Sequence, residues 1–217
     1  MVSLTPVEVH GPDMHGFADE GSYFCVQNAQ TGIATGATTN AFSDTNPFLA
    51  IYNKDVPGGK NIYLDFLALI ATAPGTAGTA LLAAAQLDLA VDRYSSGGSD
   101  LSANINNVHG GKSNGSIAKV RAGNITASAK TAAARMLVGQ RLLLPAIPVA
   151  NDTAILKFGG VDAPLILEKQ TNTFTLQQVP KVVIPPQGSC LIHIWLPSQS
   201  GAASFIPEMG WIERAGE

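Results

Sequence analysis

Charged residues are scarce in this chain. Of its 217 residues, 13% are Asp, Glu, Lys or Arg, against roughly 25% in an ordinary globular domain. A chain with so few charges has to cover more of its surface than a lone monomer does, and other protein chains are the simplest cover. The composition therefore predicts an obligate assembly. The formal net charge of −3 provides no basic field for phosphates, which argues against nucleic-acid binding.

Cysteines and long apolar runs are scarce as well. Cys25 and Cys190 lie far apart, each inside an apolar run, which favours buried free thiols over a disulfide framework. The most apolar segment, residues 62–73, is interrupted by Asp65 and is shorter than the roughly 20 residues that a membrane-spanning helix needs. We therefore expect no membrane insertion. The opening residues lack the basic start and apolar core of a secretion signal, so we expect synthesis in a cytoplasm.

Patterns typical of a catalytic or cofactor site are missing too. Residues 110–115, GGKSNG, contain the Gly-Lys-Ser end of a phosphate-binding loop, but Asn106 stands where that motif requires its first glycine. We expect a surface loop there. The chain has no Gly-x-Ser-x-Gly sequence, and neither cysteine has a protease-like sequence around it. The sequence therefore predicts a protein without catalytic residues, without a cofactor and without enzymatic activity.

The four histidines do not follow the spacing of a metal-binding motif; they are His10, His15, His109 and His193. His193 lies in an apolar run, where a hydrogen-bonded structural histidine is commoner than a metal ligand. We therefore expect no metal site. A fold that gathers these side chains around one point is the alternative.

Asp88 and Asp92 alternate with apolar residues, which places both on the polar side of a strand. We expect solvated carboxylates there rather than an acid and base pair. Arg93 follows directly, and two interpretations of it stay open. It is either a buried arginine paired with Asp92 or with a carboxylate of another chain, or an exposed cation at the end of a strand.

Short apolar runs divided by Gly, Pro and Asn fill most of the chain. Residues 182–184 and 190–196 flank Pro185 and Pro186, which predicts a β-hairpin over residues 181–197. Neither face of residues 190–196 is polar, so this strand is covered on both sides. Residues 62–70 are also apolar on both faces, which is typical of a central strand in a sandwich.

Two segments are ambiguous between helix and strand. Residues 79–87 favour a helix by composition, but the alternation in residues 87–92 favours a strand, which we expect. The alanines of residues 127–145 favour a helix that Gly139 and Pro145 limit to a few turns. We expect at most one short helix in the chain.

Together these runs supply roughly eight to ten strands, the size of a double-sheet jelly roll. The sequence therefore predicts an all-β fold: a jelly-roll-like, two-sheet antiparallel sandwich in a single domain over residues 21–217. Residues 1–20 contain proline, glycine and histidine and show neither the apolar period of a helix nor that of a strand. This pattern predicts an extended N-terminal arm that reaches a neighbouring molecule.

Three stretches carry a resemblance to a known class of proteins: VDRYSSGGSDL at residues 91–101, PAIPVANDTAILKFGG at 145–160 and VVIPPQGSCLIHIWLPSQSGAASFIPEMGWIE at 182–213. In style and order they resemble stretches of virion structural proteins from tailed bacteriophages. The resemblance covers the C-terminal two thirds of the chain. No single motif in it is diagnostic.

The resemblance implies a jelly-roll capsid decoration, or cement, protein. Such a protein would be a homotrimer on the exterior of the virion, where it would bind the major capsid protein at capsomer junctions. A glycan-binding β-sandwich protein of the phage tail or collar is the alternative. A major shell subunit, or a jelly-roll enzyme with a histidine and carboxylate cluster, also remains open.

Overall fold

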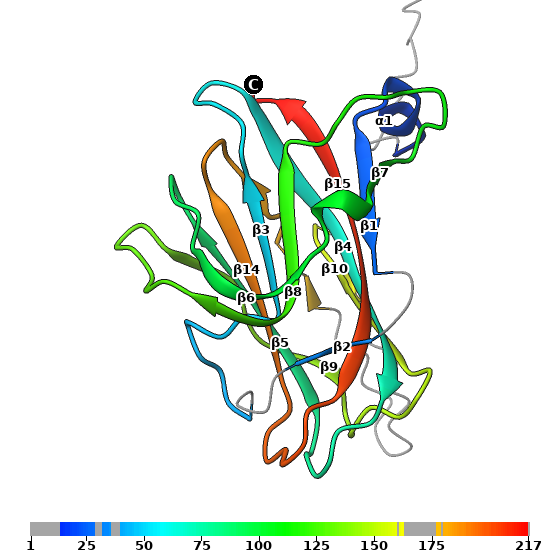
Figure 1. Cartoon of the computed structure of the whole chain (residues 1–217), viewed down its shortest axis with the longest axis vertical. Helices are drawn as coiled ribbons and strands as arrows, with labels where there is room; N and C mark the ends of the chain where they lie inside the picture. The colour runs from blue at the N-terminus through cyan, green and yellow to red at the C-terminus, as the bar shows by residue number, and fades with distance from the viewer. Residues whose placement is uncertain are drawn as a thin grey trace, which may run out of the picture.

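The protein folds into two antiparallel β-sheets that pack face to face (Figure 1), as predicted. The computed structural model describes residues 14–28, 32–35, 40–159, 161–162, 177–178 and 180–216. No helix in these residues is long and apolar enough to cross a membrane.

The first sheet, here called sheet A, has seven strands. Five strands lie side by side in the order β10 (Thr153–Lys157), β4 (Lys60–Ala73), β15 (Ser204–Ala215), β1 (Tyr23–Gln27) and β7 (Ile105–Asn107). Two short strands complete the sheet: β13 (Val183–Ile184) pairs with β4, and β2 (Ile33–Ala34) pairs with β15. The segment predicted as a central strand, residues 62–70, lies within β4, between β10 and β15.

The second sheet, sheet B, has six strands in one path. They are β6 (Tyr94–Asp100), β8 (Ala118–Ala127), β3 (Leu49–Asn53), β14 (Ser189–Trp195), β5 (Leu81–Asp88) and β9 (Arg135–Leu144). Outside the two sheets lie the helix α1 (Met14–Glu20), a 3-10 turn, η1 (Ser102–Asn104), and a two-stranded pair, β11 (Val161–Asp162) with β12 (Gln177–Gln178).

Eight of these strands pair in nested antiparallel fashion. The outermost pair is β1 with β15, followed inward along the chain by β3 with β14, β4 with β10 and β5 with β9. As a result β1-β15-β4-β10 form one sheet and β3-β14-β5-β9 the other. This arrangement is the jelly roll, and β6 and β8 are inserted between β5 and β9 and extend sheet B beyond β3.

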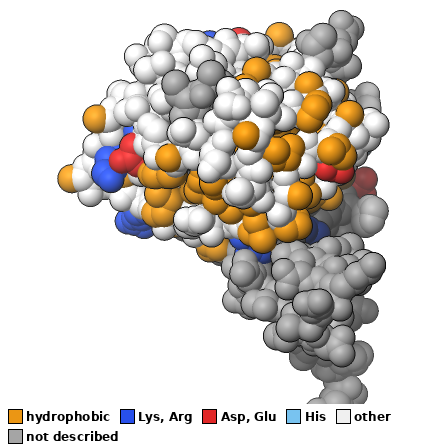
Figure 2. Space-filling model, turned by 90° about the horizontal axis from the view of Figure 1, so that it is seen from below, with side chains coloured by type: hydrophobic (Ala, Val, Ile, Leu, Met, Phe, Trp, Pro, Cys, Tyr) orange, Lys and Arg blue, Asp and Glu red, His pale blue; other side chains and the backbone are white. Residues whose placement is uncertain are grey.

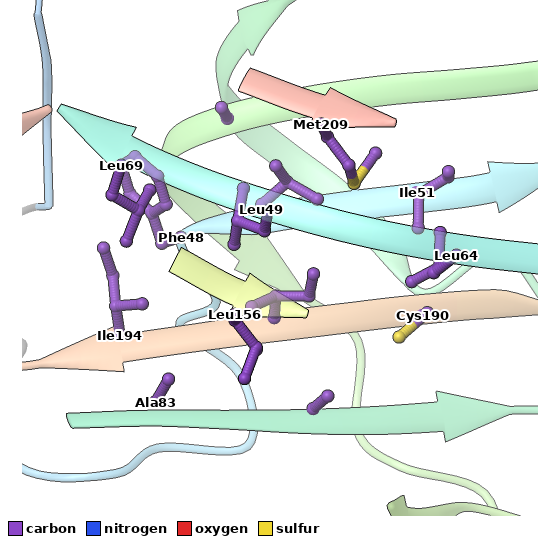
Figure 3. Close-up of a cluster of buried hydrophobic side chains, with 14 of the residues drawn as sticks. Phe48, Leu49, Ile51, Leu64, Leu69, Ala83, Leu156, Cys190, Ile194 and Met209 are labelled. Carbon is purple, nitrogen blue, oxygen red and sulfur yellow. The ribbon is translucent and has the colours of Figure 1, made fainter. Parts of the chain in front are cut away.

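The core lies between the sheets. All seven residues of β14 are buried, which confirms that this strand is covered on both faces. Cys190, Ile192 and Ile194 alternate along β14 and belong to the main cluster. Figure 3 shows side chains from both sheets meeting there, among them Leu49 of β3 and Leu156 of β10.

The predicted hairpin over residues 181–197 is wrong. β13 pairs with β4 in sheet A, whereas β14 pairs with β3 and β5 in sheet B. The turn after Pro185, closed by a hydrogen bond from Gly188 N to Pro185 O of 2.9 Å, therefore carries the chain from one sheet to the other. A strand has only two edges for hydrogen bonding, and β3 and β5 occupy both edges of β14.

The predicted helix over residues 127–145 is wrong as well. Residues 135–144 form β9, the edge strand that pairs with β5, because sheet pairing outweighs the helix propensity of a few alanines. The α-helix of the described residues is α1, at the end of the segment predicted as an extended arm. Residues 1–13 of that arm lie outside the described residues. Residues 81–87 fall in a strand, β5 (Leu81–Asp88), as predicted, although the strand ends at Asp88 rather than Asp92.

Candidate functional site

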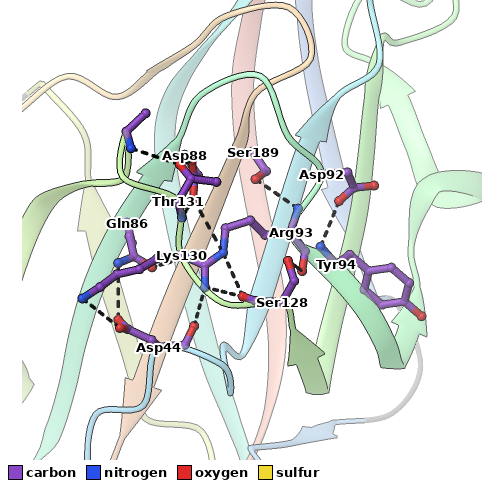
Figure 4. Close-up of polar contacts among 11 residues, drawn as sticks. Asp44, Gln86, Asp88, Asp92, Arg93, Tyr94, Ser128, Lys130, Thr131 and Ser189 are labelled. Carbon is purple, nitrogen blue, oxygen red and sulfur yellow. Dashed lines mark hydrogen bonds and ion pairs between the residues drawn. The ribbon is translucent and has the colours of Figure 1, made fainter.

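A buried polar cluster lies on the outer face of sheet B, around Arg93, in the connection from β5 to β6. The Arg93 side chain is fully buried, and its Nε lies 3.8 Å from the Asp88 carboxylate, which is also fully buried (Figure 4). The guanidinium donates a further hydrogen bond of 2.5 Å to Gln86 Oε1. We call these residues, with Asp44, Ser128 and Thr131, the Arg93 cluster.

The Arg93 cluster holds two loops on the sheet. Arg93 donates hydrogen bonds of 2.6 Å and 2.9 Å to the backbone oxygens of Ser128 and Asp44. The Asp88 carboxylate accepts hydrogen bonds from the backbone nitrogen and the hydroxyl of Thr131, at 2.9 Å and 2.5 Å. Burial lowers the pKa of Arg93, and the Asp88 and Asp44 carboxylates oppose that effect. The cluster therefore works as a clamp for the loops at residues 40–47 and 128–134.

The prediction that Asp88 is solvated is wrong, because its side chain is buried. Asp92 is half-buried and accepts a hydrogen bond of 3.0 Å from Tyr94 N. Of the two interpretations of Arg93, the buried one holds, but the ion-pair partner is Asp88 instead of Asp92. The alternation along β5 was visible in the sequence. The loops that cover its polar side come from distant residues and were not.

His193 lies on the same outer face and is 2% exposed. Its ring packs against Phe42, with 4.9 Å between the ring centroids, and neither ring nitrogen has a hydrogen-bond partner. Burial, together with the positive charge of Arg93, lowers the pKa of His193 to about 4. The ring is therefore neutral at pH 7. The backbone groups of Ser43 and Asn46 lie close enough to oppose this fall in pKa, although neither forms a hydrogen bond of regular geometry with the ring.

The other predicted positions are scattered. Within the described ranges, no three His, Cys, Asp or Glu side chains gather in a group that could hold a metal ion. His109 lies in the connection from β7 to β8, where its Nδ1 accepts a hydrogen bond of 3.0 Å from Gly111 N. His15 lies in α1 without a described side chain, and His10 lies outside the described residues. Residues 111–115 are exposed, as expected of a surface loop.

Both cysteines are free, as predicted. Cys190 is buried in the core, and this burial raises the pKa of its thiol to about 12. Cys25 is half-buried, and burial raises the pKa of its thiol as well. Neither thiol has the lowered pKa of a catalytic nucleophile.

A cavity of about 790 Å³ opens on sheet A beside α1. Lys157, Lys181 and Arg214 belong to its lining, and the Arg214 guanidinium lies 5.0 Å from the centre of the Phe17 ring. Asp65 also lines the cavity and accepts a hydrogen bond of 2.8 Å from the Tyr23 hydroxyl. The walls come from α1, β4, β13 and β15 and the end of β10, so no local pattern in the sequence indicated this cavity.

Three connections at one end of the sandwich carry a single ionisable side chain, that of Asp152. These connections are PGTAGTA at residues 74–80, PAIPVAND at 145–152 and PSQSGAA at 197–203. They lie together, since Thr76 bridges Gly201 and a Cβ at Gly78 would lie 3.4 Å from Ile147 Cγ1. Figure 2 views the molecule from this side and shows a band of apolar side chains with charged side chains at its margins.

No family model, no curated protein and no solved structure matches this chain.

Proposed function

We propose that this protein is a non-enzymatic virion structural protein that decorates and cements a bacteriophage capsid. It lies on the outside of the shell as a homotrimer and binds the major capsid protein at capsomer junctions. The observation that carries the proposal is the combination of a jelly-roll body with a chain of which only 13% of the residues are charged. Virus capsid domains are among the common uses of the jelly roll.

The polar groups of the structure support a structural role. The Arg93 cluster forms hydrogen bonds with the backbones of two loops. Its ion pair is buried, so neither Arg93 nor Asp88 is open to a substrate. Cementing needs no chemistry of that kind. Several interfaces, each of roughly 1,000 Å² or more, add their free energies and tie shell subunits together.

Shell binding tests this proposal directly. Purified protein is added to empty shells of the phage that encodes it, and the shells are sedimented and imaged by electron microscopy with and without the protein. We expect extra density at capsomer junctions and a fixed copy number relative to the major capsid protein. A protein that stays in the supernatant and adds no density contradicts the proposal. In a second arm, a chain lacking residues 1–13 tests the predicted arm, and we expect it to fold and to lose shell binding.

The cavity on sheet A favours a second candidate, a glycan-binding protein of the phage tail or collar. Its lining combines the aromatic rings of Phe17 and Tyr63 with the polar groups of Asn61 and Asp65, and its volume falls in the range of ligand pockets. A carbohydrate array distinguishes the two candidates. Saturable binding to one glycan class, abolished by Tyr63→Ala, supports the second candidate, and a blank array supports the first.

A further inference from the structure

The cavity on sheet A has a row of polar side chains along one wall. Asn61, Tyr63 and Asp65 alternate along β4 and line the cavity, while the residues between them, Ile62 and Leu64, are buried in the core. The pairing of β4 with β15 shifts its register here and leaves Asp65 without a partner residue on β15. A bulge of this kind re-aims a side chain. The outer face of sheet A therefore presents three hydrogen-bonding groups to the cavity.

Three cations surround this row. Arg214 lies on β15 directly opposite Asn61, Lys157 ends β10 and Lys181 lies just before β13. All three are exposed and line the cavity, and within the described residues none of them forms an ion pair. Asp65 is the single carboxylate among the described residues of the lining. The cavity thus has three positive charges against one negative, in a chain whose formal net charge is −3.

We infer that the cavity binds an acidic saccharide, whose anionic group is held by Lys157, Lys181 and Arg214. An arginine can bind a carboxylate or a sulfate through two parallel hydrogen bonds, and a lysine adds a point charge. The Arg214 guanidinium lies 5.0 Å from the centre of the Phe17 ring and forms no side-chain hydrogen bond within the described residues. The aromatic contact therefore holds the guanidinium in place and leaves its N–H groups for a ligand.

The rest of the lining suits the neutral part of a sugar. The Asp65 carboxylate accepts one hydrogen bond of 2.8 Å, from the Tyr23 hydroxyl, and an ionised carboxylate can accept several more. Asn61 donates to the Tyr63 hydroxyl at 3.4 Å, so that hydroxyl keeps its own proton for a ligand oxygen. The ring of Phe17 provides an apolar surface. A ligand with one anionic group and several hydroxyls matches these groups.

This inference deepens the second candidate function and rests on it for a sugar as the ligand. What it adds is the charge of that sugar. A neutral glycan would leave three cations without a partner in the cavity, whereas an acidic one gives them an anion to bind.

The test compares acidic sugars with neutral ones on the full chain. The acidic probes are glucuronate, galacturonate and sialic acid for a carboxylate and glucose 6-sulfate for a sulfate, and the neutral probes are glucose and galactose. Saturation-transfer NMR detects weak binding and gives each dissociation constant. We expect at least one acidic probe to bind at least about tenfold more tightly than both neutral ones, because a hydrogen bond to a charged group is lost with the anion. Added salt should weaken that binding.

Two variants locate the binding. Lys157→Gln combined with Lys181→Gln removes two charges from the cavity, and the matched control, Lys54→Gln with Lys119→Gln, removes two exposed charges that do not line it. We expect the cavity variant to weaken binding of the acidic probe at least about tenfold. The control should weaken it less than about twofold, since distant exposed charges are screened by salt. Equal weakening by the two variants overturns the inference.

The remaining outcomes separate this inference from the proposed functions. Equal binding of acidic and neutral sugars overturns the inference and leaves a glycan-binding protein as a candidate. Binding of inorganic sulfate without binding of any sugar also overturns it, because the cavity would then take a simple anion. If no probe binds, both the inference and the second candidate fail, while shell binding tests the capsid function separately.

Discussion

Arg93 and Asp88 form an ion pair with 3.8 Å between Nε and Oδ2, and both side chains are completely buried. Two buried charges are expensive to desolvate, and such pairs often contribute little net stability over apolar residues of the same shape. Replacing only one of the two residues is strongly destabilising, because the remaining charge stays buried without its partner. The Arg93 cluster therefore makes the anchoring of two loops depend on one guanidinium.

Replacing this arginine should be strongly destabilising. For Arg93→Met we expect a loss of about 3–5 kcal/mol in the free energy of unfolding, because Asp88 is left unpaired and two backbone carbonyls lose their donor. Urea denaturation measures the loss. The matched control is Lys130→Met, which removes an ion pair of 3.0 Å with Asp44 whose side chains are 58% and 30% exposed, and which should cost about 1 kcal/mol or less. Equal losses for the two variants would sink this account of the cluster.

The general architecture was predictable from residues such as Cys190, Ile192 and Ile194, whose alternation within a run apolar on both faces indicates a covered strand. The partners of that strand were not predictable. A turn at Pro185 fits a chain that stays in one sheet and a chain that crosses to the other sheet. The crossing follows from the pairing of β14, because β3 and β5 occupy both of its edges.

The sites were less predictable than the fold for a similar reason. The alternation along β5 places Asp88 on the polar side of the strand and predicts a solvated carboxylate. In the structure the loop containing Thr131 covers it. The small number of charged residues was visible in the composition, but which connections share one end of the sandwich depends on the jelly-roll topology. That topology places residues 74–80, 145–151 and 197–203 side by side.

Gly123 should be essential to the fold of β8. It has a φ of +110°, and a Cβ at this position would lie 2.5 Å from Ile33 Cγ2. Gly123→Ala therefore combines backbone strain with a collision, and we expect a loss of about 2 kcal/mol or more in the free energy of unfolding. Gly139→Ala in β9 is the control, since a Cβ there meets nothing within 4 Å. A change of less than about 0.5 kcal/mol is expected for the control, and the same small change at Gly123 would contradict the prediction.

Neighbouring residues of β10 should differ sharply in their contributions to stability. Leu156 is fully buried between the sheets, whereas Ile155 is 56% exposed. Leu156→Ala removes buried apolar atoms and leaves a cavity, which should cost about 2–5 kcal/mol. Ile155→Ala should cost about 1 kcal/mol or less, because its side chain remains largely in water when the chain folds. Thermal and urea unfolding of both variants test the orientation of this edge strand, and a larger cost at Ile155 would mean that the strand faces the other way.

His193 should make the stability of this protein fall in mild acid. Burial and the charge of Arg93 lower its pKa to about 4 in the folded protein, against about 6.5 in an unfolded chain. Between these values the unfolded chain binds a proton that the folded protein does not. The free energy of unfolding therefore decreases as the pH falls. The contribution of His193 is complete above pH 6.5 and is lost progressively down to about pH 4, to a total of about 3 kcal/mol.

A variant isolates this effect from the titration of other groups. His193→Met places an apolar side chain of similar size against Phe42 and removes the titrating ring. Urea unfolding at several values between pH 7 and pH 4 should show the stability of the original chain falling relative to that of the variant. Because the nearby Asp44 and Arg93 are present in both proteins, their contributions largely cancel in the difference. A difference that stays constant across this pH range would mean that His193 titrates near its usual pKa and is not held in a dry site.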